Sequence, residues 1–331
     1  MMNLITMGRR GALVLATALL GAACSPASDT NESSTTQTNQ ALPAGNIDDA
    51  RINNAASEPG TWLAHGLDYR EQRFSPLTQI NRDTVAELGL AYELDVGSND
   101  ALEATPIVVD NTLFFTSTYS IVHAVDAVSG EELWRYDPQV PKEFLRKACC
   151  GPINRGVSVY QGNVYVATLD GRLVAVKASN GEKVWEVDTV IDRDRFYSIT
   201  GAPKTAKGKV FIGNGGAEFG VRGYVTAYDA ATGEQIWRFY TVPGDPSLPF
   251  EHPEMELAAT TWKGGAWWEV GGGGTVWNSI VYDPEFDQVY LGVGNGAPWT
   301  RVIRSPGGGD NLFLSSIVAV DADTGSMNWY Y

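Results

Sequence analysis

Four copies of one short pattern constrain the fold of this chain more than any other feature of the sequence. Each copy runs Ala-x-Asp (Lys in the second copy), Ala, two residues and Gly, and a Trp follows the Gly after four positions. The tryptophans are Trp134, Trp185, Trp237 and Trp329, at intervals of 51, 52 and 92 residues. Three units are therefore regularly spaced, and the long last interval contains either an insertion or a diverged unit.

Each copy predicts a β-hairpin. The Asp side chain can accept hydrogen bonds in the turn, the Gly supplies a positive φ, and alternating apolar residues flank both. Another pair of apolar strands precedes the hairpin, for example 105–109 with 113–117 and 157–159 with 164–167. Four strands in each unit of roughly 50 residues are typical of a propeller blade. The sequence therefore predicts an all-β chain folded as a β-propeller.

Composition excludes several classes of protein. The 331 residues are 44% hydrophobic, which is enough for a sizeable core and argues against a disordered chain. Lys and Arg number 24 against 39 Asp and Glu, so the net charge is −15. Nucleic-acid binding needs a basic surface, so we expect no nucleic-acid partner.

The N-terminus has the features of an export signal. Arg9 and Arg10 precede the apolar run 11–23, which ends in small residues directly before Cys24. We expect residues 1–23 to be a signal peptide and 24–48 a polar, flexible tether, with the propeller occupying 49–331. Cys24 is either the lipid-modified first residue of the mature chain or an incidental residue after ordinary cleavage. Export to the periplasm follows in both cases.

Three clusters outside the repeat are candidates for chemistry. Cys149 and Cys150 are adjacent in an exported chain and are either two free thiols or a strained vicinal disulfide of the kind held at functional sites. Glu218 lies among small residues, where its charge needs a partner that a bound cation can supply. Trp277 follows four glycines and is not explained by the repeat; indole is the largest flat platform that a protein offers to a planar ligand.

The repeat and these clusters together resemble the pyrroloquinoline quinone (PQQ) alcohol dehydrogenases, in particular the quinohaemoprotein branch. The docking tryptophans by themselves indicate architecture only, because non-catalytic propeller scaffolds also carry them. The resemblance covers about residues 60–331 and implies roughly half of an eight-bladed ring. It also implies a catalytic Asp beyond Tyr331, so the chain is interpreted as the N-terminal part of a longer enzyme and is expected to be inactive alone.

The resemblance assigns roles residue by residue. It implies a vicinal disulfide between Cys149 and Cys150 on one face of the quinone and Trp277 on the other. The expected Ca²⁺ ligands are Glu218 and Asn295, and Gly215 stands where the methanol-oxidising branch has Ser. The remaining cofactor contacts that it implies are Glu103, Arg155, Thr200, Gly216 and Ala217.

The implied function is oxidation of a small alcohol to an aldehyde, with PQQ and Ca²⁺ as cofactors and a cytochrome c or a quinone as electron acceptor. The 331 residues contain no Cys-x-x-Cys-His motif, so a covalently attached haem c would need a further domain. Two alternatives stay open: a non-catalytic propeller lipoprotein of the outer membrane, and a PQQ dehydrogenase of sugars or polyols. The cysteine pair disfavours the second, because the glucose branch generally lacks it.

Overall fold

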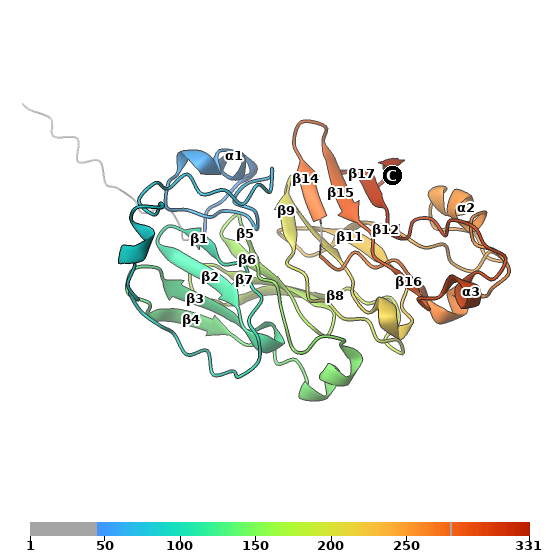
Figure 1. Cartoon of the computed structure of the whole chain (residues 1–331), viewed down its shortest axis with the longest axis horizontal. Helices are drawn as coiled ribbons and strands as arrows, with labels where there is room; N and C mark the ends of the chain where they lie inside the picture. The colour runs from blue at the N-terminus through green and yellow to red at the C-terminus, as the bar shows by residue number, and fades with distance from the viewer. Residues whose placement is uncertain (1–44, 279) are drawn as a thin grey trace, which may run out of the picture. The chain divides into compact units, whose positions relative to one another are not determined.

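The computed structural model describes residues 45–278 and 280–331 (Figure 1). The predicted signal peptide, Cys24 and the tether up to residue 44 lie outside the described residues. The packed region includes residues 45–48, which composition had placed in the tether: Ile47 is fully buried, and its carbonyl accepts a 2.8 Å hydrogen bond from the Gln161 N–H. No helix in the described ranges is long and apolar enough to cross a membrane.

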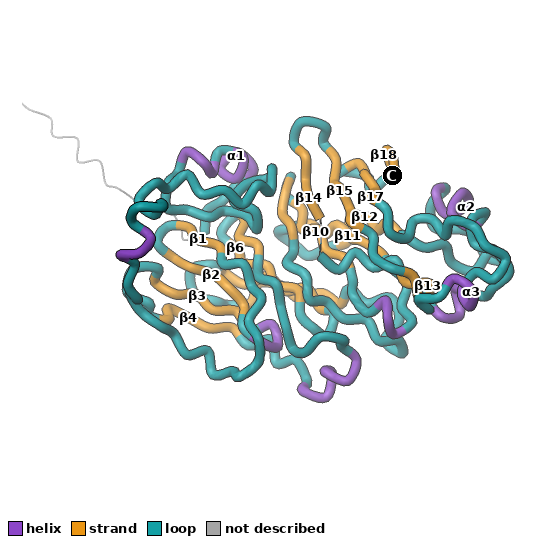
Figure 2. Tube along the Cα trace, in the orientation of Figure 1, coloured by secondary structure: helices purple, strands orange, loops and turns teal. Residues whose placement is uncertain are grey.

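Four antiparallel sheets of four strands each form the framework (Figures 1 and 2). The strands of every sheet follow chain order. The first sheet contains β1 (Ile107–Val109), β2 (Thr112–Thr116), β3 (Val122–Asp126) and β4 (Glu132–Tyr136). The second contains β5 (Ser158–Tyr160), β6 (Asn163–Ala167), β7 (Arg172–Lys177) and β8 (Lys183–Asp188). The third contains β9 (Lys204–Ala206), β10 (Lys209–Gly213), β11 (Tyr224–Asp229) and β12 (Gln235–Tyr240). The fourth contains β14 (Ile280–Asp283), β15 (Gln288–Gly292), β17 (Ile317–Asp321) and β18 (Met327–Tyr330).

Short helices and one two-stranded ribbon lie before the first sheet and in the segments between strands. The ribbon pairs β13 (Gly272–Gly273) with β16 (Gly296–Ala297). The α-helices are α1 (Asp49–Asn53), α2 (Glu254–Ala259) and α3 (Arg301–Arg304). The 3-10 helices are η1 (Ala55–Ser57), η2 (Val85–Glu87), η3 (Thr118–Ser120), η4 (Lys142–Lys147), η5 (Ala217–Phe219) and η6 (Trp267–Val270).

The repeat builds the outer hairpin of each sheet, as the sequence predicts. In the first copy Asp126 Oδ1 accepts hydrogen bonds from the N–H groups of Val128 and Ser129, and Gly130 has φ 78°. A side chain at that φ would be strained, which explains the Gly. The long interval before Trp329 is an insertion, because β14 and β15 pair directly with β17 and β18 in one sheet, and the described residues of this interval form no further four-stranded sheet.

Trp134, Trp185 and Trp237 each pack against the turn of the following sheet, whereas Trp329 lies in the last of the four sheets. The Trp134 Nε1–H donates a 3.0 Å hydrogen bond to the Ala178 carbonyl, and a Cβ on Gly181 would lie 2.6 Å from the Trp134 ring. Trp185 and Trp237 repeat this arrangement on the next two sheets. The turn Gly is thus needed twice, for its φ and for the approach of the indole.

The first turn has a docking partner that the repeat does not reveal. The ring of Tyr92 lies against Gly130, where a Cβ would be 2.4 Å from the ring, and the Tyr92 hydroxyl donates a 3.2 Å hydrogen bond to the Ala127 carbonyl. Tyr92 therefore takes the place of a docking Trp on the first sheet.

Candidate functional site

A cavity of about 230 Å³ brings together most of the residues singled out by the sequence. Of the predicted site residues, all line it except Glu103 and Ala217. The lining residues are Cys149, Cys150, Arg155, Ser198, Thr200, Gly215, Gly216, Glu218, Thr275, Trp277 and Asn295. They come from the loops before β5 and β9, from η5 and the two glycines before it, and from the segments that flank β13 and β16.

The cysteine pair follows η4 and is joined by a disulfide, with the two Sγ atoms 2.16 Å apart. The chain beyond it is anchored by Asn154, which is 2% exposed. The Asn154 Oδ1 accepts hydrogen bonds from the Thr116 hydroxyl and the Gly156 N–H, and its Nδ2 donates to the Ser120 hydroxyl and the Ala167 carbonyl. A fully satisfied buried amide fixes the position of its neighbours.

Arg155, the next residue, is positioned by three contacts. Its Nη1 donates a 2.5 Å hydrogen bond to the Thr200 hydroxyl, and its Nη2 lies 3.2 Å from Glu103 Oε2. Its guanidinium carbon lies 5.1 Å from the centroid of the Trp277 ring. Glu103 thus contacts Arg155 and does not line the cavity itself, so its predicted contact with a cofactor stays a prediction.

Glycines hold the segment that carries Trp277. A Cβ on Gly213 would lie 2.1 Å from the Val276 carbonyl oxygen, and one on Gly201 would lie 2.6 Å from that of Trp277. A Cβ on Gly294 would lie 3.3 Å from the edge of the Trp277 ring. The backbone of Val276 and Trp277 therefore lies close to the end of β10 and to the loop before β9, and Trp277, which is 45% exposed, lines the cavity.

Glu218 is presented by the single turn η5. Gly216 and Gly220 flank this turn with φ 98° and 75°, and a Cβ on Gly216 would lie 2.4 Å from the Phe196 carbonyl oxygen. Ala217 is 2% exposed and packs inward, away from the lining. The glycines on both sides thus allow the turn to project its carboxylate.

Asn295 follows β15 and lies beside the ribbon of β13 and β16. Its Nδ2 donates a 3.2 Å hydrogen bond to the Gly296 carbonyl, which leaves the amide oxygen as the group able to accept from, or bind to, a ligand. In the parts of the chain that are described, no group of three or more His, Cys, Asp or Glu side chains could hold a metal ion. A cation at Glu218 and Asn295 would therefore need further oxygen ligands.

Two lining residues, Ser198 and Thr275, were missed by the sequence reasoning. Both are buried, at 5% and 1% exposure. Each lies two positions before a residue that was found, Thr200 and Trp277. Along extended backbone, residues two apart face the same side, so that spacing was the signal that could have revealed them.

The cavity can accommodate a planar ligand that carries carboxylate and carbonyl groups. The indole offers a planar surface, the disulfide lines the cavity with it, and Arg155 and three hydroxyl groups can donate hydrogen bonds to carboxylates or carbonyls. This donor set fits a planar quinone with several carboxylates.

Comparisons with known proteins agree with this chemistry. Residues 62–331 match the family model described as PQQ: glucose/ethanol/alcohol dehydrogenase, β-propeller domain. Quinohemoprotein alcohol dehydrogenase ADH IIB of Pseudomonas putida is 56% identical over 291 residues, which are 88% of this chain and 42% of that protein. The chain thus spans about two fifths of the length of such relatives.

Solved structures give the same result. The structure of the quinohemoprotein alcohol dehydrogenase ADHIIG from Pseudomonas putida HK5 superposes with a TM-score of 0.85 at 56% identity. The match covers 88% of this chain and 42% of that one. That of the quinohemoprotein alcohol dehydrogenase of Comamonas testosteroni superposes with a TM-score of 0.85 at 50% identity, over 87% and 43%. The chain therefore belongs to the PQQ-dependent glucose, ethanol and alcohol dehydrogenase family and forms part of its β-propeller domain.

Proposed function

We propose that this protein takes part in the oxidation of small alcohols to aldehydes with PQQ and Ca²⁺ as cofactors. The observation that carries the proposal is the cavity bounded by the Cys149–Cys150 disulfide and the Trp277 indole, with Arg155 and Glu218 beside them. The relatives named above are alcohol dehydrogenases, which supports an alcohol as the substrate.

The chain's own residues would hold and orient the quinone. Trp277 would stack on one face of the ring system, with the disulfide on the other. Arg155, already ordered by Thr200 and Glu103, would donate charge-assisted hydrogen bonds to quinone or carboxylate oxygens. Bound in this way, PQQ would supply the two-electron oxidant and Ca²⁺ a Lewis acid.

Glu218 and Asn295 are the proposed Ca²⁺ ligands of this chain. Ca²⁺ takes six to eight oxygen ligands, and this pair supplies one carboxylate and one amide oxygen. Cofactor oxygens and other groups would complete the coordination. Because Glu218 supplies the charge of the pair, it is the residue on which ion affinity should depend most.

The proton acceptor is a separate requirement. Among the described residues that line the cavity, Glu218 is the single carboxylate, and none is a His. A carboxylate bound to Ca²⁺ is a poor base, so the proton of the alcohol must pass to a group beyond these lining residues. This agrees with the expectation of an Asp elsewhere in the whole enzyme.

Glu218→Gln tests the proposal, with Glu234→Gln, an exposed Glu in the turn before β12, as the matched control. The assay is alcohol-dependent reduction of a dye by the whole PQQ-loaded enzyme, titrated with Ca²⁺. We expect the half-saturating Ca²⁺ concentration to rise by about tenfold or more in Glu218→Gln, because hydrogen bonds and contacts to a full charge are worth more than 1 kcal/mol. Equal Ca²⁺ requirements in both variants would reject the assignment.

Electron transfer to a cytochrome c or a quinone is a further part of the proposal. The net charge of −15 supports docking of a positively charged protein acceptor such as a cytochrome c. Initial rates with purified cytochrome c and with a soluble ubiquinone analogue compare the two acceptors directly. Export to the periplasm and lipid attachment at Cys24 are also proposals, which cell fractionation after labelling with a palmitate analogue tests.

A further inference from the structure

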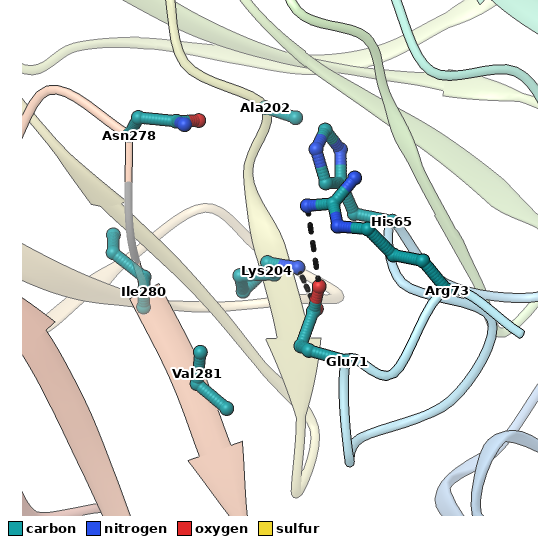
Figure 3. Close-up of a pocket in the computed structure, with 8 residues that line it drawn as sticks. All are labelled: His65, Glu71, Arg73, Ala202, Lys204, Asn278, Ile280 and Val281. Carbon is teal, nitrogen blue, oxygen red and sulfur yellow. Dashed lines mark hydrogen bonds and ion pairs between the residues drawn. The ribbon is translucent and has the colours of Figure 1, made fainter.

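A second cavity, of about 150 Å³, lies between the segment before the first sheet and the inner strands β9 and β14 (Figure 3). Its polar wall is formed by His65, Glu71, Arg73 and Lys204, and Asn278 faces it from the loop after Trp277. The proposed cofactor site uses none of these residues.

The charged groups form a triad with an excess of positive charge. The Lys204 Nζ forms an ion pair with Glu71 Oε1, and Arg73 Nη2 lies 3.7 Å from Glu71 Oε2. One carboxylate thus faces two cations. Glu71 compensates the charge of Lys204, whose side chain is only 14% exposed and whose pKa is lowered by burial. The excess positive charge therefore lies on Arg73, at the more exposed edge of the cavity.

The positive charges of Lys204 and Arg73 also act on the imidazole of His65. Burial lowers the pKa of His65, and together with the positive charges of Lys204, Arg73 and Arg155 it brings this pKa to about 3. The imidazole is therefore neutral at pH 7 and adds no positive charge, but its N–H can still donate a hydrogen bond.

The loop that carries these groups is held in an unfavourable backbone conformation. Leu67, Glu71 and Arg73 have φ of 83°, 53° and 54°. Gly66 makes the fold of the loop possible, because a Cβ there would lie 2.4 Å from Glu71 Cα. Strain of this kind costs about 1–3 kcal/mol per residue and is concentrated at ligand sites.

The wall opposite Arg73 is apolar and is formed by Ile280 and Val281, and Ala202 lies beside His65. An inorganic oxyanion would leave this wall without a partner, whereas a carboxylate with a short hydrocarbon tail would cover it. We propose that this cavity binds a short-chain aliphatic carboxylate, with its head group on Arg73, Lys204 and Asn278 and its tail on Ile280 and Val281.

The three histidines of the chain provide a site-specific test, because only His65 lines the cavity. Butyrate is titrated into the purified protein in chloride-free buffer, and the imidazole resonances are followed by NMR. We expect a saturable shift of the His65 signals alone, with His123 and His252 unchanged. Inorganic phosphate, which lacks the tail, and butylammonium, which has the opposite charge, should produce no saturable shift at the same concentrations.

Arg73→Gln and Arg70→Gln are the matched variants. Both arginines are largely exposed in the same loop, but Arg70 pairs with Asp68 and does not line the cavity. Arg73→Gln should weaken butyrate binding about tenfold, and Arg70→Gln should leave it unchanged. The His123 and His252 signals report whether each variant is folded. An unmoved His65 signal, equal binding of phosphate, or equal affinities of the two variants would overturn the proposal.

Discussion

The guanidinium of Arg155 lies over the indole of Trp277, 5.1 Å from the ring centroid, while its Nη1 donates a hydrogen bond to Thr200. A cation over an aromatic face is attracted by the ring quadrupole. The pair therefore keeps Arg155 at the Trp277 end of the cavity, where both can contact one planar ligand.

Replacing Trp277 should weaken PQQ binding. Trp277→Ala removes the stacking surface, and we expect about a tenfold or greater rise in the dissociation constant, with Trp277→Phe intermediate. Quenching of protein fluorescence by PQQ in the presence of Ca²⁺ measures the change. Trp299→Phe is the control, because Trp299 is 72% exposed and does not line the cofactor cavity.

The docking tryptophans should contribute unequally to stability. Trp185 packs on Gly233 and donates a hydrogen bond to Ala230, whereas Trp329 is 42% exposed. We expect Trp185→Ala to lower the free energy of unfolding by about 3 kcal/mol and Trp329→Ala by less than about 1 kcal/mol. Urea denaturation of both variants measures this difference, and equal losses would contradict the docking role.

A methyl group on Gly213 should disturb the cofactor site through the backbone. Its Cβ would lie 2.1 Å from the Val276 carbonyl oxygen, next to Trp277. We expect Gly213→Ala to destabilise the protein by about 1–3 kcal/mol and also to weaken PQQ binding. Gly89→Ala, where a Cβ would meet no atom within 4 Å, is the control. An unchanged melting temperature for Gly213→Ala would show that the end of β10 and the Val276 backbone are not in close contact.

The free energy of unfolding should decrease as the pH is lowered, because of His65. Burial and the positive charges of Lys204, Arg73 and Arg155 lower the pKa of His65 to about 3, from 6.5 in the unfolded chain. The unfolded state therefore takes up a proton first as the pH falls. The stabilising contribution is complete above about pH 6.5 and is lost progressively toward pH 3.

The matched variant for this prediction is His65→Gln, which cannot titrate. The difference in unfolding free energy between wild type and His65→Gln, measured by urea denaturation between pH 7 and pH 4, isolates this residue from the carboxylates. A difference that does not vary with pH would contradict the prediction.

Local sequence was sufficient to predict the hairpins, since the turn Asp, the Gly and the Trp lie within one short stretch of chain. Cys149, Glu218 and Trp277 stand out by their local setting and Arg155 by the family resemblance, and the structure brings all four to one cavity; their roles stay predictions. The docking of Tyr92 on Gly130 could not be predicted, because it joins residues 38 positions apart with no repeated pattern.

The second cavity could not be predicted from the sequence either. Glu71 and Lys204 are separated by 133 positions, and neither stands in a motif. The third sheet and the loop before the first sheet must be placed in space before these residues become neighbours. Likewise, the long interval before Trp329 could be assigned to an insertion only when β14 and β15 were seen to pair with β17 and β18.

A crystal structure of the protein with PQQ and Ca²⁺ tests the central claim most directly. We predict quinone density between the Trp277 indole and the Cys149–Cys150 disulfide, and an ion about 2.3–2.6 Å from oxygens of Glu218 and Asn295. Quinone bound elsewhere, or a cation held without Glu218 and Asn295, would contradict the account.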